Sequence, residues 1–122
     1  MEAVKEYKNG NGLLTLKVKE EKDKVIVDWE GESTDDNPAK YLEPVFNEIF
    51  KDDSRHYVMN IGKLKYMNSG TMTPLITLLK RMTKGEGSFL INYDANVKWQ
   101  ELSFDALILF QTEDERINIV GI

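Results

Sequence analysis

Hydroxyl and amide side chains gather in residues 68–71, which read Asn-Ser-Gly-Thr. An apolar run at residues 57–61 precedes this stretch and predicts a buried strand, and a helical pattern with Pro74 in its first turn follows it. Ser69 therefore falls in the loop just before a helix N-terminus, where backbone N–H groups and the helix dipole favour an anion. The chemistry that this arrangement suits is a phosphoryl group on Ser69.

The neighbours of Ser69 suggest supporting roles. Asn68 can position the loop through side-chain hydrogen bonds, and Gly70 would let another protein approach the backbone closely. Thr71 is a back-up phosphoacceptor, although helix capping is the more ordinary role for a threonine there. The alternative is that Ser69 is only a turn or capping residue, in which case a charge at position 69 would change no binding.

The expected partner surface is the exposed side of the helix after the loop, together with the loop itself and the start of the preceding helix. Its polar residues lie off the apolar stripe, and several are basic although the protein as a whole is acidic. A local basic bias suits an acidic rim on a partner, whereas the alternative is simply a solvated face. The predicted partner-binding residues are Lys65, Thr73, Thr77, Lys80 and Arg81.

Enzymatic chemistry has little support. His56 is the single histidine, and the strand between it and Ser69 places the two on the order of 20 Å apart at about 3.3 Å per residue, beyond proton-transfer range. The carboxylate clusters at residues 35–36, 52–53 and 113–115 lack the spacing of a calcium loop. The sequence contains no cysteine and no glycine-rich phosphate loop. We therefore expect no catalytic site, no metal site and no cofactor.

Composition points to one folded domain. The chain has 122 residues, 41% of them hydrophobic and 30% charged, with a net charge of −5. An acidic protein is a poor partner for nucleic acid, because phosphate binding needs a basic face. No apolar run reaches the roughly 18 residues of a membrane span, and residues 1–9 have no signal-peptide core. We expect a cytoplasmic protein without membrane insertion.

The hydrophobic pattern predicts a mixed sheet. Alternating residues indicate an antiparallel hairpin at 14–18 and 25–29. The remaining elements give the order ββαβαβαβ, in which right-handed crossovers create parallel strands and helices pack against the sheet, so the fold class is α/β. Residues 1–11 end in Asn-Gly-Asn-Gly and are expected to be flexible, and residues 12–122 form the domain. The later elements are helices at 38–50, 74–82 and 99–110 and strands at 57–61, 88–93 and 117–122.

This order and this loop together resemble the STAS domains of bacterial anti-sigma-factor antagonists, over residues 12–122. Residues 29–32 (Trp-Glu-Gly-Glu) resemble the family strand that ends in a Gly-Glu turn, and residues 58–61 its central strand. Residues 66–70 (Tyr-Met-Asn-Ser-Gly) resemble its phosphorylation loop, usually Asp-Ser-Ser-Gly or Asp-Ser-Thr-Gly. The loop here is one residue shorter, Asn68 takes the acidic position, and the usual C-terminal helix is not found after the last strand.

A second resemblance is to the SiaC-type regulatory phosphoproteins, STAS-like proteins that control a diguanylate cyclase. It rests on residues 31–33 (Gly-Glu-Ser), on Asp-Asn at 36–37, and on residues 41–45 with their internal Pro44. The SiaC-type loop reads Asn-Thr-Ser-Ser after a Leu-x-Tyr strand end. Residues 64–69 align with it without a gap and place Ser69 at the acceptor, while Gly70 and Thr71 replace serines.

These resemblances imply a non-enzymatic switch protein. The unphosphorylated form would bind a regulatory partner, phosphorylation of Ser69 by a kinase would release it, and a phosphatase would reverse the modification. The partner would be either a serine kinase that is also an anti-sigma factor, or a diguanylate cyclase. The alternatives are a small-molecule sensor with a cavity near the loop, and a structural interaction domain without a phosphoswitch.

Overall fold

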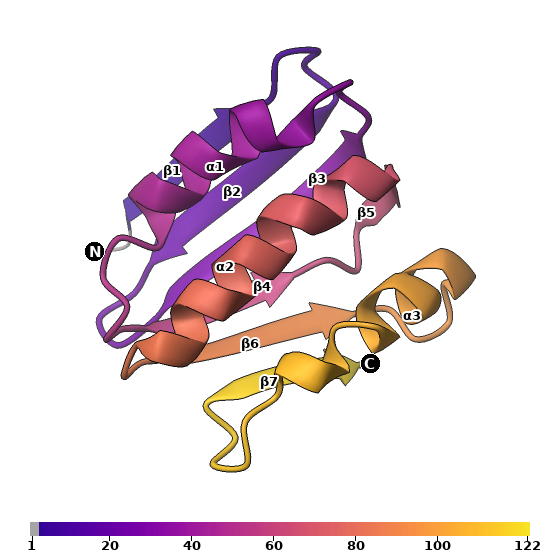
Figure 1. Ribbon diagram of the computed structural model, residues 1–122. Helices are drawn as coiled ribbons and strands as arrows, with labels where there is room; N and C mark the ends of the chain where they lie inside the picture. Colours follow the sequence, from indigo (N-terminus) through magenta and orange to yellow (C-terminus); the bar gives the residue numbers. More distant parts are fainter. Residues whose placement is uncertain (1–2) are drawn as a thin grey trace.

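The computed structural model describes residues 3–122 as one seven-stranded sheet with helices packed against it (Figure 1). Strand order is β1-β2-β3-β4-β6-β7, and β5 pairs separately with β3. The strands are β1 (Ala3–Lys8), β2 (Leu14–Glu20), β3 (Val25–Ser33), β4 (His56–Asn60), β5 (Leu64–Met67), β6 (Ser88–Tyr93) and β7 (Ile117–Gly121). The helices are α1 (Pro38–Ile49), α2 (Met72–Lys84) and α3 (Lys98–Asp105), with short 3-10 helices η1 (Ser69–Thr71) and η2 (Ile108–Phe110).

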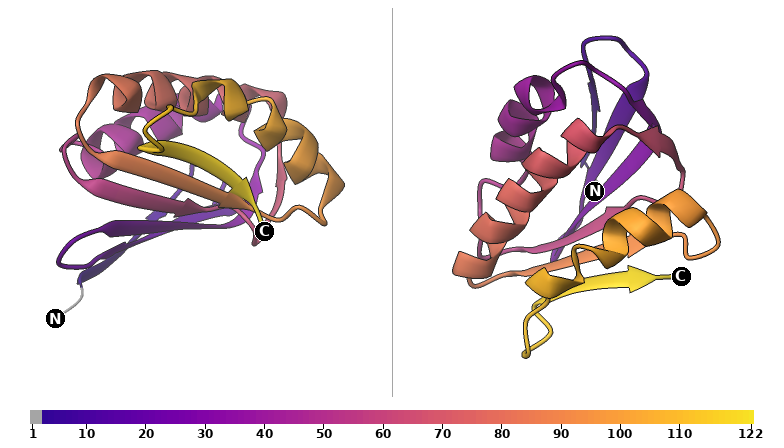
Figure 2. Two further views of the ribbon diagram at one scale, coloured as in Figure 1. Left: turned by 90° about the horizontal axis from the view of Figure 1, so that it is seen from below. Right: turned by 45° about the vertical axis from the view of Figure 1, so that its right-hand side comes forward.

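The predicted α/β class and mixed sheet are confirmed. Strands β1, β2 and β3 run antiparallel, whereas β3, β4, β6 and β7 pair in parallel. All three α-helices lie on one face of the sheet (Figure 2). Along β2, β3, β4 and β6, buried residues alternate with partly exposed ones, as expected for a sheet covered on one side. The opposite face of the sheet is open.

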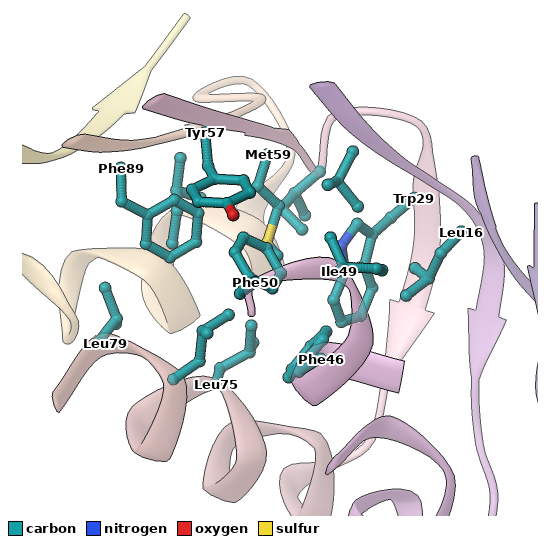
Figure 3. Close-up of a cluster of buried hydrophobic side chains, with 14 of the residues drawn as sticks. Leu16, Trp29, Phe46, Ile49, Phe50, Tyr57, Met59, Leu75, Leu79 and Phe89 are labelled. Atoms are coloured by element: carbon teal, nitrogen blue, oxygen red, sulfur yellow. The ribbon is translucent and has the colours of Figure 1, made fainter. Parts of the chain in front are cut away.

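An aromatic cluster holds α1 onto the sheet (Figure 3). The Phe50 ring lies 4.7 Å from Tyr57 of β4 and 5.4 Å from Phe89 of β6, measured between ring centroids. Phe46, one turn earlier, contacts both Phe50 and Trp29 of β3. Such tilted and edge-to-face pairs stabilise a core beyond their buried area. The cluster fixes α1 over the centre of the sheet, which places the start of α1 beside the loop that carries Ser69.

Two strands were missed in the sequence, so the observed order is βββαββαβαβ rather than ββαβαβαβ. Strand β1 lies in the segment that was expected to be flexible, and it pairs with β2 along its whole length. Its outward residues are mostly charged and so give no apolar alternation; Glu6 faces Lys17 across the pair at 3.9 Å. Strand β5 has four residues, too few for a periodic signal.

The third helix ends earlier than predicted, and its predicted buried face is only partly right: Leu107 is buried and Trp99 and Phe110 pack against the core. Helix α3 stops at Asp105 rather than continuing to Phe110. Leu102, expected in the apolar stripe, is 62% exposed, whereas Gln100 and Phe104 are fully buried. Gln100 and Phe104 are four residues apart and therefore share a helix face. The error arose because the buried face is marked by a glutamine that is held by hydrogen bonds.

Tyr41 gives a test of the packing of α1. Its hydroxyl is buried and has no hydrogen-bond partner among the described residues, and this burial raises its pKa to about 12, helped by nearby Tyr7 and Asp35. We expect Tyr41→Phe to match or exceed the wild type in stability, by up to about 1 kcal/mol, because it removes an unpaired polar group. Urea denaturation at pH 7 measures the difference.

The pH dependence has a definite sign. The folded protein favours the neutral phenol of Tyr41 over the phenolate more strongly than the unfolded chain does, because the tyrosine pKa of the unfolded chain is near 10. This contribution to stability is complete below pH 10 and is lost as pH rises toward 12. Tyr41→Phe should therefore lose less stability than the wild type over that range.

Tyr57→Phe is the control for the Tyr41 variant. The Tyr57 hydroxyl donates to the Asp52 carbonyl at 2.8 Å, so loss of this hydroxyl should cost about 1 kcal/mol. A Tyr41 variant less stable than the Tyr57 variant would contradict the argument.

Candidate functional site

Ser69 is exposed at the start of a continuous helical segment. It is the first residue of η1, which runs directly into α2, and its carbonyl accepts the backbone N–H of Met72. Its hydroxyl makes no hydrogen bond to residues 3–122. The segment lies at the end of the sheet where β5 passes into α2 (Figure 1). A kinase or a partner protein can therefore reach this hydroxyl without displacing it from an internal contact.

Asn68 ties the loop to the connection between β3 and α1. Its side-chain amide donates to the Asp35 carbonyl at 2.8 Å, and its backbone N–H donates to the Ser33 carbonyl at 2.9 Å. Its side-chain oxygen accepts the Thr71 hydroxyl at 2.9 Å. These three bonds use both the backbone and the side chain of one residue. Asn68 thus holds the turn that presents Ser69.

Thr71, the back-up acceptor, has a different environment from Ser69. Its side chain is fully buried, and its hydroxyl lies 2.7 Å from the Ser33 hydroxyl as well as bonding to Asn68. It makes no side-chain capping bond to α2. A phosphate on Thr71 would require the contact between β3 and η1 to open. Thr71 therefore holds the loop against β3 through these buried hydrogen bonds.

Gly70 packs closely against the start of α1. A Cβ atom at this position would lie 3.1 Å from Cδ of Pro38, the first residue of α1. Such a contact is tighter than normal van der Waals packing, so a side chain here would require η1 or the Pro38 ring to shift by a few tenths of an ångström. The close packing of η1 on α1 therefore favours a small residue at this position.

The predicted partner-binding residues fall into two groups. Lys65, Thr73, Thr77 and Lys80 are exposed, and the last three follow one another at helical spacing along α2. Arg81 is half-buried: its guanidinium donates to the Asn47 side chain at 2.7 Å and to the Phe46 carbonyl at 3.2 Å. Arg81 therefore connects α2 to α1, and these two internal hydrogen bonds hold its guanidinium against α1.

An aromatic pair beside the loop was not predicted as part of the site. Tyr66 is 47% exposed, and its ring centroid lies 6.4 Å from that of Trp99 on α3. Leu102, one turn further along α3, is also exposed. Ser33 was missed as well, because it lies 38 residues from Thr71 and no local pattern links the two. In the sequence, only the position of Tyr66 three residues before Ser69 could have indicated that it belongs to this surface.

His56 is not part of this site. Its Nδ1 atom lies 2.7 Å from the Ser88 hydroxyl, on the neighbouring strand at the amino ends of β4 and β6. Within residues 3–122 no three His, Cys, Asp or Glu side chains are grouped so that they could hold a metal ion. Nor does the described part of the chain contain a helix long and apolar enough to cross a membrane.

Comparison with known proteins supports the fold. No protein-family model matches the sequence, and no curated protein sequence matches it. The structure is similar to that of an anti-sigma factor antagonist from Mycobacterium paratuberculosis, with a TM-score of 0.62 and 17% sequence identity. The similarity covers 90% of this chain and 95% of the other. At this identity the likeness establishes a shared STAS-like architecture.

Proposed function

We propose that this protein is a non-enzymatic signalling switch, which binds a regulatory protein when Ser69 is unmodified and is released when Ser69 is phosphorylated. The observation that carries the proposal is the position of Ser69. Its hydroxyl is exposed and free of internal bonds, yet the surrounding turn is fixed by the contacts of Asn68 and Thr71. A fixed, accessible hydroxyl suits modification without unfolding of the loop.

A phosphate at Ser69 would act mainly through charge. It carries about −1.5 to −2 charges at neutral pH. The fold can tolerate it, because it would lie at the positive end of the helical segment formed by η1 and α2. The same charge would oppose an acidic partner drawn to Lys65 and Lys80, since like charges across an interface cost several kcal/mol. Phosphorylation would therefore weaken binding and leave the fold intact.

The proposed partner surface extends beyond the loop. Thr73, Thr77 and Lys80 continue it along α2, and Tyr66 with Trp99 borders it on the α3 side. Aromatic residues contribute heavily to binding energy when a partner covers them. We infer that this pair forms the apolar centre of the interface and that the lysines lie on its rim.

Two partner classes fit the proposal. The structural likeness to an anti-sigma factor antagonist favours a serine kinase that is also an anti-sigma factor. The ungapped alignment of residues 64–69 with SiaC-type loops favours a diguanylate cyclase. Either partner would act with a kinase and a phosphatase in the cytoplasm, where such signalling proteins work.

Retention of partners from source-cell lysate tests the switch. We expect wild-type and Ser69→Ala protein to retain one common partner, and Ser69→Glu to retain it at least tenfold less strongly, as loss of about 1.4 kcal/mol would give. Lys22→Gln is the matched control, because it changes the net charge equally in the exposed turn between β2 and β3. Identification of the retained protein separates the two partner classes. Equal retention by all four proteins would make Ser69 a structural turn residue.

A further inference from the structure

A polar row crosses the open face of the sheet. Asp28 of β3 pairs in register with Asn60 of β4, and Asn60 with Asn92 of β6. The residues that follow Asp28 and precede Asn60 in their strands, Trp29 and Met59, are fully buried beneath the helices. Because successive strand residues point to opposite faces, the polar row faces away from α1 and α2. It lines a groove of about 560 Å³, within the size range of small-molecule sites.

Hydrogen bonds fix the direction of the amides in this row. Asn60 donates from its side-chain nitrogen to Asp28 at 2.7 Å, and Asn92 donates to the Asn60 oxygen at 3.0 Å. A carboxylate can only accept, so both amides turn an N–H toward Asp28. The second oxygen of Asp28 and the side-chain oxygen of Asn92 have no partner among the described residues. The groove therefore presents open acceptors to a ligand.

The charges around the groove also favour a ligand that donates hydrogen bonds and carries positive charge. Asp94 adds a second carboxylate to the wall, one of its oxygens accepting the backbone N–H of Asn96 at 2.9 Å. Lys17, the neighbour of Asp28 on β2, is committed to Glu30 at 3.0 Å and also lies 3.9 Å from Glu6. Among the described residues that line the groove, Lys63 is the one cation, and its side chain is exposed. Asp28 forms no ion pair within residues 3–122.

We propose that this groove binds a small primary amine, with its ammonium group on the polar row formed by Asp28, Asn60 and Asn92. An ammonium carries three N–H donors and no acceptor, which complements open carboxylate and amide oxygens. Calcium would usually take six to eight oxygen ligands, more than two separated carboxylates supply. The groove also lies at the carboxyl ends of the parallel strands β4 and β6, where ligands of open α/β sheets bind. The proposal does not depend on Ser69.

Titration with putrescine, followed by the side-chain amide NMR signals of Asn60 and Asn92, tests this site. We expect both signals to shift and saturate. Butane-1,4-diol and succinate match the chain length without the ammonium and should produce no shift. Asp28→Asn should weaken putrescine binding at least tenfold, the range for loss of a charge-assisted hydrogen bond. Asp23→Asn, the same exchange at an exposed turn, should leave binding unchanged.

Lys63 allows a second test, in which a substitution should strengthen putrescine binding rather than weaken it. Lys63→Gln removes the repelling ammonium of the wall and should tighten putrescine binding. The proposal is overturned if putrescine causes no shift at about 10 mM, roughly ten times a Kd of about 1 mM. It is equally overturned if calcium chloride or the diol shifts the same signals, or if Asp28→Asn binds as the wild type does. None of these results bears on the phosphorylation of Ser69.

Discussion

Replacement of Gly31 by alanine is expected to destabilise the fold by more than about 4 kcal/mol, enough to abolish most of the stability of a domain of this size. Gly31 has a φ angle of +90°, a region that side-chain-bearing residues rarely adopt. An added Cβ atom would also overlap the carbonyl oxygen of Leu13, the residue immediately before β2. That oxygen accepts the backbone N–H of Glu32 at 3.0 Å, so it cannot withdraw without loss of a second contact.

Chemical denaturation with Gly10→Ala as the control measures this effect. Gly10 has no atom within 4 Å of a built Cβ and no positive φ angle, so the same exchange should change stability by less than about 0.5 kcal/mol. If Gly31→Ala unfolded at nearly the wild-type urea concentration, the tight approach of Gly31 to Leu13 would not exist in solution.

Gly31 also matters for the position of Ser69. The register between β3 and β5 shifts between Gly31 and Glu32, after which Ser33 pairs with Met67. Ser33 continues the inward alternation of Val27 and Trp29 along β3, is buried, and places its hydroxyl 2.7 Å from that of Thr71. Gly31 thus lies two residues before the serine of β3 that contacts the loop. A partly folded Gly31→Ala variant should lose the partner even with Ser69 intact.

The sequence predicted those elements whose apolar residues repeat clearly. Leu14, Leu16 and Val18 alternate along β2, and Leu75, Leu78 and Leu79 repeat along α2; all five of those leucines and the valine are buried in the core. The placement of Ser69 before a helix followed from the same patterns, because a strand and a helix flank it on either side. Apolar periodicity indicates which face of an element is buried. In β2 and α2 the buried face and the secondary structure both match the predicted period.

The remaining features depend on contacts between distant residues, which periodicity cannot show. Strand β1 pairs with β2, a distant contact that its own composition does not reveal, and the groove row unites Asp28, Asn60 and Asn92 from three strands. In the sequence these polar residues are indistinguishable from solvated ones. Arg81 was predicted as a surface cation for the same reason, although two hydrogen bonds hold its guanidinium against α1.

Gln100 is the clearest case, since a fully buried glutamine near the start of α3 organises the segment between β4 and β5. Its side-chain nitrogen donates to the carbonyls of Ile61 at 3.2 Å and Leu64 at 3.0 Å, with Gly62 at 3.4 Å. Its side-chain oxygen accepts the backbone N–H of Asp94 at 2.8 Å. Gly62 and Asp94 line the groove, and Leu64 begins the strand that leads to Ser69. One side chain therefore supports both proposed sites.

Substitution of Gln100 by leucine is expected to destabilise the protein by about 2–4 kcal/mol, because it leaves the Asp94 N–H and at least the Leu64 carbonyl buried without their side-chain partner. Gln111→Leu is the matched control: Gln111 is exposed and accepts only the Ile119 N–H, so its loss should cost less than about 1 kcal/mol. Urea denaturation gives both values. Amide hydrogen exchange should in addition show faster exchange at Leu64 and Asp94 in the Gln100 variant, since these residues then open without global unfolding. Equal stability of the two variants, with unchanged exchange at these amides, would mean that Gln100 does not hold this segment in solution.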